Sequence, residues 1–203
     1  MTFESSKNLS AVGALLIVIG AVLGFAVSFS GIVSLIGIIL LLIGLKGLAN
    51  FYKEDGIFNN ALYSMITAIV GCVVGVGVIV TSAVSALADL GIDWANIEDW
   101  GNVGTDVGTV FTDFDFSAIL SLLGALLVGL LIIFVFFIIS MFFLRKSMNQ
   151  LSTKSGIGLF GTAGILVLIG AVIPVIGLLI IWIGFILATV ALFQIKKEET
   201  KAQ

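Results

Sequence analysis

The sequence predicts an all-α fold: a polytopic transmembrane helical bundle that crosses the bilayer in six spans, arranged as three helical hairpins. Sixty per cent of the 203 residues are apolar and only 10% are charged. The mean hydropathy is +1.30, which is beyond the range of a soluble domain. The apolar residues fall in blocks long enough to cross a hydrocarbon core of about 30 Å. We therefore expect a single membrane domain over residues 1–203.

Two of the hairpins are expected where a long apolar block must fold back on itself. The block Leu9–Leu45 would be roughly 55 Å long as one helix, too long for one crossing, so it should turn near Ser28, Ser30 and Gly31. The last block should turn at the single proline, Pro174. An acidic external loop at 88–117 separates the third and fourth spans. The predicted spans are about 9–27, 31–47, 61–87, 118–144, 157–173 and 175–194.

The basic residues favour one orientation in the cell membrane. If the N-terminus is cytoplasmic, all nine Lys and Arg residues fall on the cytoplasmic side, as the positive-inside rule requires. The loop 88–117 then lies outside with seven acidic residues and no basic one. We expect both termini in the cytoplasm. The basic residues are Lys7, Lys46, Lys53, Arg145, Lys146, Lys154, Lys196, Lys197 and Lys201.

The first predicted span has two interpretations. Residues 1–30 could be a cleaved signal peptide, with Lys7 in its charged region. We favour a retained helix, because its apolar stretch is long for a signal peptide and Leu15–Val22 closely resembles Ile165–Val172. This likeness predicts that the first and last hairpins are repeats, although strings of Leu, Ile and Gly also look alike by chance.

Small residues spaced by four predict where the helices pack closely, since lipid offers no hydrophobic drive for helix association. The first and third spans each carry a Gly-x-x-x-Gly motif, and the fourth carries an unbroken stripe of small residues. We expect these positions to form helix contacts in the bundle. They are Gly20, Gly24, Gly71, Gly75, Ser117, Ser121, Ala125 and Gly129.

The residue inventory makes catalysis improbable. The chain has no His, and its single Cys, Cys72, lies in an apolar run without a Cys-x-x-Cys spacing. No carboxylate pair or amide is expected at mid-depth in the spans. Hydroxyls within the spans, such as those of Ser64 and Ser140, can bond back to their own helices. We therefore expect no catalytic residue, no cofactor, no metal site and no nucleic-acid partner.

The loop 88–117 is the segment that differs most from a membrane helix, because it mixes acidic and aromatic residues. It could dock a partner protein, bind a divalent cation loosely through carboxylate oxygens, or be a solvated acidic loop. No Asp-x-Asp-x-Asp-Gly spacing supports the cation site. The candidate docking residues are Trp94, Asp99, Trp100, Asp113, Phe114 and Asp115.

Four segments resemble recurring patches of a known family: Ser6–Leu9, Leu45–Ala49, Asp55–Tyr63 and Lys154–Phe160. The family, domain of unknown function 996, consists of small multi-spanning membrane proteins, mainly archaeal. The resemblance covers most of the chain apart from the acidic loop. It implies a membrane location and an archaeal source, and it brings no catalytic or binding residues.

These observations favour an uncharacterised integral membrane protein that is not an enzyme. The leading hypothesis is an accessory or scaffold subunit, or a lipid-organising component, whose partners are the lipid bilayer and other membrane subunits or copies of itself. The alternative is a transporter or channel for a neutral or apolar solute, with a pore lined by hydroxyls and glycines. A water-accessible cavity would favour the alternative.

Overall fold

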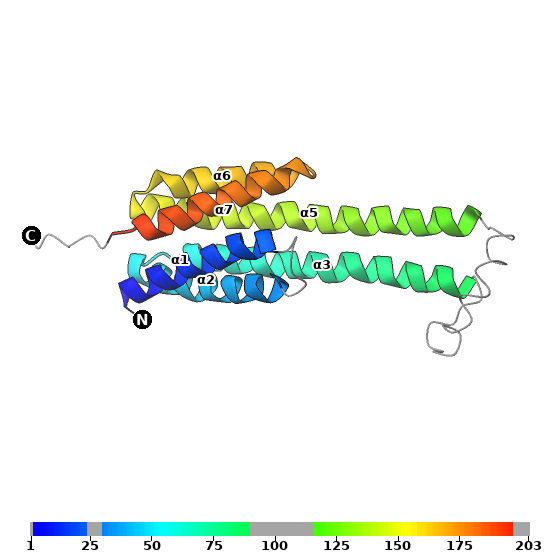
Figure 1. The fold of residues 1–203 in the computed structure, drawn as a ribbon, viewed down its shortest axis with the longest axis horizontal. Helices are drawn as coiled ribbons and strands as arrows, with labels where there is room; N and C mark the ends of the chain where they lie inside the picture. Colours follow the sequence, from blue (N-terminus) through cyan, green and yellow to red (C-terminus); the bar gives the residue numbers. More distant parts are fainter. Residues whose placement is uncertain (1, 24–29, 90–115, 197–203) are drawn as a thin grey trace, which may run out of the picture. The chain divides into compact units, whose positions relative to one another are not determined.

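The computed structural model describes residues 2–23, 30–89 and 116–196 of the chain. These ranges are helical apart from short connections (Figure 1). The prediction of an all-α helical bundle is confirmed. The helices are α1 (Phe3–Leu23), α2 (Ser30–Tyr52), α3 (Asp55–Asp89), α5 (Phe116–Ser155), α6 (Gly158–Val172) and α7 (Ile176–Gln194).

Five of these helices, α1, α2, α3, α5 and α7, are long and apolar enough to cross a membrane. Helix α6 is also apolar but has only 15 residues. Helices α3 and α5 are the longest, with 35 and 40 residues. A helix of 20 residues already spans about 30 Å, so α3 and α5 exceed the length of one crossing.

Helix α5 does not end where the sequence predicted that its span would stop. The span was expected to end at Leu144, before Arg145 and Lys146, but the helix continues to Ser155. The residues that follow include Arg, Lys, Met, Gln and Leu, which are good helix formers. In addition, Ser147 and Leu151 are buried. The charged residues can mark a membrane boundary without ending the helix.

The chain forms two compact units, one of Met1–Thr67 with Phe137–Gln203 and one of Ala68–Phe136. We call them unit 1 and unit 2. Unit 1 holds α1, α2, α6 and α7 together with the first part of α3 and the last part of α5. Unit 2 holds the remaining parts of α3 and α5.

In unit 1, α1 and α2 form an antiparallel hairpin with close backbone contact. Gly44 lies against Ser10, and Gly13 lies against Gly37 and Leu41. A Cβ atom added to Gly13 would come within 2.7 Å of the Gly37 carbonyl oxygen. Real Cβ atoms do not approach that closely, so glycine is required for this helix spacing.

Helices α6 and α7 form a second antiparallel hairpin in unit 1. Gly170 and Gly177 face each other across it, and Gly184 lies against Val167. This hairpin also contacts α1, where the indole Nε1 of Trp182 donates a hydrogen bond of 3.2 Å to the Val18 carbonyl.

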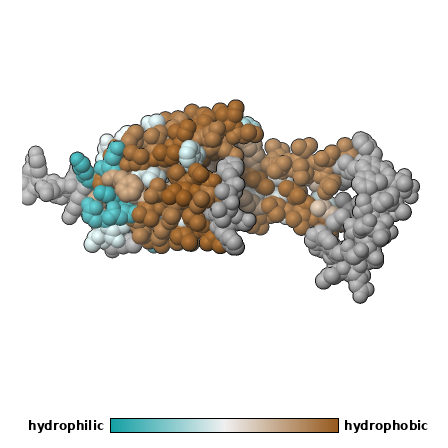
Figure 2. Space-filling view, viewed as in Figure 1, coloured by the Kyte–Doolittle hydropathy of each residue, from teal (hydrophilic) through white to brown (hydrophobic). Residues whose placement is uncertain are grey.

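The core of unit 1 lies at one end of its helices. Its buried residues come from all six helices and from Ile195, which follows α7. The large ones include Leu48, Ile57, Leu151 and Phe160. At this end α1, α3 and α6 begin and α2, α5 and α7 end (Figure 1). Figure 2 shows hydrophilic residues gathered there, while most of the other coloured residues on the visible face of unit 1 are hydrophobic.

Unit 2 is an antiparallel pair formed by α3 and α5, with large apolar side chains on its outside. Gly71 lies against Phe136, and Gly75 lies against Gly129 and Ile133. Outward-facing side chains are largely exposed, for example Leu127 at 67%. Such a surface is stable in hydrocarbon and unfavourable in water.

Candidate functional site

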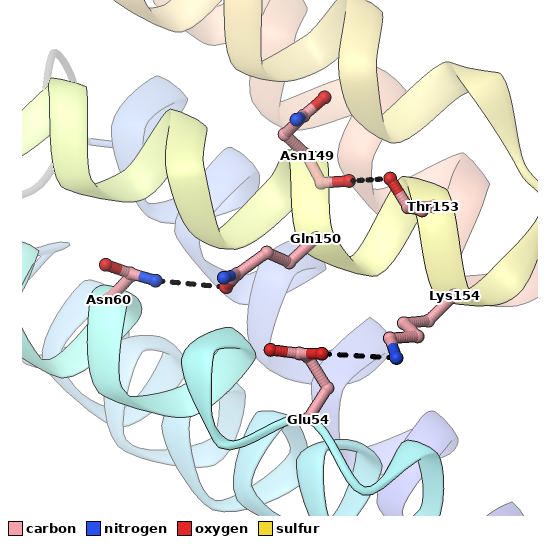
Figure 3. A network of polar contacts seen from close by, with 6 residues as sticks. All are labelled: Glu54, Asn60, Asn149, Gln150, Thr153 and Lys154. Atoms are coloured by element: carbon pink, nitrogen blue, oxygen red, sulfur yellow. Dashed lines mark hydrogen bonds and ion pairs between the residues drawn. The ribbon is translucent and has the colours of Figure 1, made fainter.

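Polar side chains concentrate where α3 begins and α5 ends (Figure 3). Lys154 Nζ lies 3.2 Å from a carboxylate oxygen of Glu54. Asn60 Nδ2 donates to Gln150 Oε1 at 3.0 Å and to the Gly56 carbonyl at 2.7 Å. These contacts tie the start of α3 to the end of α5.

The same part of α5 carries a hydroxyl at each of three further positions. Thr153 Oγ1 donates to the Asn149 carbonyl at 3.0 Å within α5. Ser152 Oγ reaches the connection to α6 and donates to the Ile157 carbonyl at 3.0 Å. Ser147 Oγ donates across to the Ile57 carbonyl in α3.

Two buried serines link α3 and α5 further along the pair. Ser140 Oγ donates to the Ser64 carbonyl at 2.8 Å, and the two Oγ atoms lie 3.0 Å apart. A hydroxyl has one hydrogen to donate, so Ser64 is the donor in the bond between the hydroxyls. Ser140 is only 1% exposed and Ser64 only 6%. These two hydroxyls therefore bond across to the other helix, and neither makes the bond back to its own helix that the sequence allows.

Other hydroxyls do bond back to their own helices, as the sequence predicted. Thr81 Oγ1 donates to the Gly77 carbonyl at 2.8 Å, and Thr189 Oγ1 donates to the Phe185 carbonyl at 2.8 Å. Ser64 and Ser140 differ because each faces another helix at close range. A bond across the interface then satisfies the hydroxyls and also joins the helices.

Basic side chains surround this polar end of unit 1. Lys46, Lys53, Arg145, Lys146 and Lys196 are exposed. The ammonium group of Lys46 also lies 5.4 Å from the ring centroid of Phe58, within cation–π range. The stem of each side chain is long enough to reach past neighbouring apolar surface into water.

A cavity of about 20 Å³ lies inside unit 1. A space of this size holds about one water molecule. Its lining is apolar apart from Ser147, whose hydroxyl is bonded to the Ile57 carbonyl. The cavity is therefore a packing defect between α1, α2, α5, α6 and α7, too small for an organic solute.

Comparison with known proteins shows which family this arrangement represents. Residues 33–193 match the family model described as "Protein of unknown function (DUF996)". The chain belongs to the DUF996 family. The family resemblance that the four recurring patches suggested is thereby confirmed.

This DUF996 protein also resembles "Uncharacterized protein MJ1644" of Methanocaldococcus jannaschii. The two are 23% identical over 197 residues, which cover 96% of this chain and 94% of the relative. The relative is archaeal, as the family resemblance implied for this chain. No solved structure matches the DUF996 chain.

The helix-packing positions expected from the sequence fall into three groups in the DUF996 protein. Gly20 lies against Ser34 in α2, while Gly71, Gly75 and Gly129 form the close contact in unit 2, with Ala125 half-buried. Ser117 and Ser121 belong to α5, but their side chains lie outside the described part of the structure. Gly24 also lies outside the described residues.

The candidate docking residues of the acidic loop, Trp94, Asp99, Trp100, Asp113, Phe114 and Asp115, lie outside the described residues as well. Within residues 2–23, 30–89 and 116–196, no group of three or more His, Cys, Asp or Glu side chains could hold a metal ion. Cys72 is a free, exposed thiol.

Sequence reasoning missed the polar contacts between α3 and α5. A signal was present, because Asn60 and Ser64 are four residues apart in α3, and Ser140 and Ser147 are seven apart in α5. Both spacings keep the side chains on one face of a helix. Two polar faces in apolar helices predict a shared interface, since each needs a partner away from water.

Proposed function

We propose that this DUF996 protein is a multi-pass protein of the cell membrane that acts without catalysis. It serves as an accessory or scaffold subunit of a membrane complex, or as a component that organises lipid. Its termini are cytoplasmic and the segment 88–117 is external. The proposed orientation is supported by the exposed basic side chains around one end of unit 1, since basic residues favour the cytoplasmic side.

The observation that carries this proposal is how the buried polar side chains are used. Ser64, Ser140, Ser147 and Asn60 are buried and bond between α3 and α5. On α1, Ser10 Oγ donates to the Ser6 carbonyl at 2.9 Å, beside the contact with Gly44. The bonds of α3 and α5 hold these two helices together, and the Ser10 hydroxyl is satisfied within α1. This use of the polar groups favours a structural role over substrate binding.

The alternative of a transporter or channel for a neutral or apolar solute receives less support. Such a protein needs a passage or binding cavity near mid-depth. The cavity in unit 1 has a volume of about 20 Å³ and an apolar lining. We therefore place the packing role first.

The orientation can be tested by thiol labelling in vesicles of known sidedness. In a Cys72→Ala background, Lys53→Cys should react with a membrane-impermeant maleimide only when the cytoplasmic face is accessible. Asp99→Cys should react only from the opposite face. The same sidedness for both positions, or the reverse assignment, would overturn the proposed topology.

The scaffold role requires a separate experiment. The tagged protein should be extracted from native membranes into a native nanodisc and weighed intact by mass spectrometry. A stoichiometric partner protein would support the subunit role, and enrichment of one lipid class over the bulk membrane would support lipid organisation. Recovery as a monomer with bulk lipid composition would contradict both.

A further inference from the structure

The turn between α6 and α7 consists entirely of apolar residues. Ile173, Pro174 and Val175 connect the two helices, and Ile176 begins α7. Val175 is 81% exposed and Ile176 is 64% exposed. The next turn of α7 continues this surface with Leu178. A connection in water would normally carry polar residues or glycine, so the composition of this tip needs a physical reason.

The carbonyl groups of the turn all accept hydrogen bonds from nearby backbone amides. Val175 has φ 65 and ψ −70, and the Ile176 amide donates to the Pro174 carbonyl at 2.8 Å. These values describe a γ-turn with positive φ, a rare and strained conformation, above all for a β-branched residue. The Ile173 and Val175 carbonyls accept bonds from Gly177 at 3.1 Å and Leu178 at 3.2 Å.

Such a turn suits an environment without water. In hydrocarbon every backbone polar group must find a partner inside the protein. All three carbonyls of the connection do so, and Pro174 has no amide hydrogen to satisfy. Within the described residues, the Val175 amide is the one N–H group of the connection that donates no hydrogen bond. In water the carbonyls could bond to solvent, and the strained conformation of Val175 would bring no advantage.

The hairpin is also too short to reach the far side of a bilayer from its observed position. Helix α6 has 15 residues, about 22 Å at 1.5 Å per residue, against a hydrocarbon core of about 30 Å. Its first turns lie beside the polar part of α5, where a Cβ on Gly161 would come 3.5 Å from Ser152 Oγ and one on Gly164 would come 3.3 Å from Arg145.

Arg145 and Lys146 are exposed and must reach the headgroup region. Because Gly164 lies against the Cα and Cγ atoms of Arg145, this residue of α6 lies within one side-chain length of the headgroup region. The remaining segment, Ile165–Val172, is about 12 Å long. Helix α7 is long enough to cross by itself, but Gly184 lies against Ala163 and Val167, so its second half stays beside the same polar level.

We propose that α6 and α7 form a re-entrant hairpin that enters from the cytoplasmic side and turns inside the hydrocarbon layer. The tip Ile173–Ile176 contacts lipid acyl chains. This inference rests on the proposed membrane orientation and replaces the two full crossings, 157–173 and 175–194, that the sequence predicted. The hairpin inserts into one leaflet and offers an apolar surface to its lipids.

Site-directed spin labelling tests the position of the tip. Val175→Cys, and Ile176→Cys as a second variant, are made in the Cys72→Ala background, labelled in detergent and reconstituted into phosphatidylcholine vesicles. Leu127→Cys in α5 serves as the lipid-exposed reference and Lys53→Cys as the aqueous reference. Collision rates are measured with oxygen, which enters the hydrocarbon, and with a neutral nickel chelate, which stays in water.

The tip labels should match Leu127→Cys, with high oxygen and low nickel accessibility. In separate samples without spin label, the Val175→Cys and Ile176→Cys thiols should not react with an impermeant maleimide from either side of the vesicle. High nickel accessibility or labelling from the external side would overturn the re-entrant hairpin. Low accessibility to both reagents would overturn contact with acyl chains, because protein would then cover the tip.

The reference position separates this inference from the proposed membrane location. If Leu127→Cys is accessible to the nickel chelate, the membrane location itself fails. If Leu127→Cys is protected and only Val175→Cys and Ile176→Cys are accessible, the membrane location stands and the re-entrant hairpin fails.

Discussion

Helices α3 and α5 are held together differently in the two units of the molecule. In unit 1 their contact is polar, with the Ser64–Ser140 hydroxyl pair and the Asn60–Gln150 bond. In unit 2 it is steric, with the backbone at Gly75 lying against Gly129. The comparison shows two ways of joining helices in an apolar environment, used by one pair of helices.

The difference follows the degree of burial. In unit 1 Ser140 is only 1% exposed and Ser64 only 6%. Hydroxyl pairs are protected there from competing partners. In unit 2 the outer side chains are exposed, for example Leu127 at 67%. Its buried residues within the described part are Gly71, Gly75 and Gly129, which we call the glycine seam. Close backbone approach gives dispersion contacts without any polar group that lipid would penalise.

The largest expected effect comes from filling the glycine seam of unit 2. A Cβ on Gly75 would lie 2.7 Å from the Gly129 carbonyl oxygen, so Gly75→Ala should force the helices apart and destabilise the protein by about 1–3 kcal/mol. The control is Gly77→Ala, two positions along the same helix, where no atom lies within 4 Å. That change should be neutral or should stabilise by up to about 1 kcal/mol.

Unfolding free energies measured by steric trapping in bicelles would check this pair of variants. Gly129→Ala and Gly124→Ala repeat the test on α5. A Cβ on Gly129 would lie 2.8 Å from the Gly75 carbonyl oxygen, whereas a Cβ on Gly124 would meet open space. Equal effects of Gly75→Ala and Gly77→Ala would show that the seam does not hold unit 2 together.

The close packing at Gly71 and Gly75 was predicted from the sequence. The polar faces of α3 and α5 also left a signal there, but the sequence does not say which partner each buried hydroxyl takes. Gly71 and Gly75 form a Gly-x-x-x-Gly motif. This spacing marks a close-packing face from the sequence of one helix alone, without knowledge of its neighbour. The direction of the Ser64 hydroxyl depends on which helix lies opposite, which is a tertiary property. A hydroxyl can bond to its own helix or across an interface, and composition does not distinguish the two.

The same division applies to the ends of the helices. Hydropathy located the apolar blocks, and hence the helices, because burial in lipid requires length and composition alone. It could not show that α5 continues to Ser155, because that extension is stabilised by buried contacts of Ser147 and Leu151. It also could not show that Gly164 lies beside Arg145, which limits the reach of α6.

A moderate effect is expected from breaking the hydroxyl pair of unit 1. Ser64→Ala, Ser140→Ala and the double variant form a thermodynamic cycle. Side-chain hydrogen bonds between membrane helices couple by about 0.6 kcal/mol on average and up to about 1.7 kcal/mol. We expect the upper half of this range, because Ser140 bonds both the Ser64 hydroxyl and the Ser64 carbonyl. The cycle is measured by steric trapping as above.

Thr81 provides the control for the hydroxyl itself. Its Oγ1 bonds only carbonyls of its own helix, those of Gly77 and Val78. Thr81→Ser keeps this bond, and Thr81→Ala removes it without touching another helix. Both should change stability by less than about 0.5 kcal/mol. A Ser64–Ser140 coupling energy near zero would mean that the two hydroxyls lie close together but do not measurably stabilise the contact of α3 and α5 in unit 1.

The smallest effect is expected at the exposed end of the polar contact, where Lys154 pairs with Glu54 at 3.2 Å. Their side chains are 41% and 31% exposed, so solvent competes for both charges, and the pair should contribute below about 0.5 kcal/mol. Lys154→Met and Glu54→Gln, measured at low and high salt, check this estimate, since screening weakens an exposed pair. Lys53 is an exposed residue at the same end, and Lys53→Met controls for the loss of one positive charge.

A loss above about 1 kcal/mol that does not depend on salt would show that the ion pair helps to hold α3 to α5. The polar contact of unit 1 would then depend on the exposed Glu54–Lys154 ion pair as well as on the buried hydroxyls, and the degree of burial alone would not explain the difference between the two units.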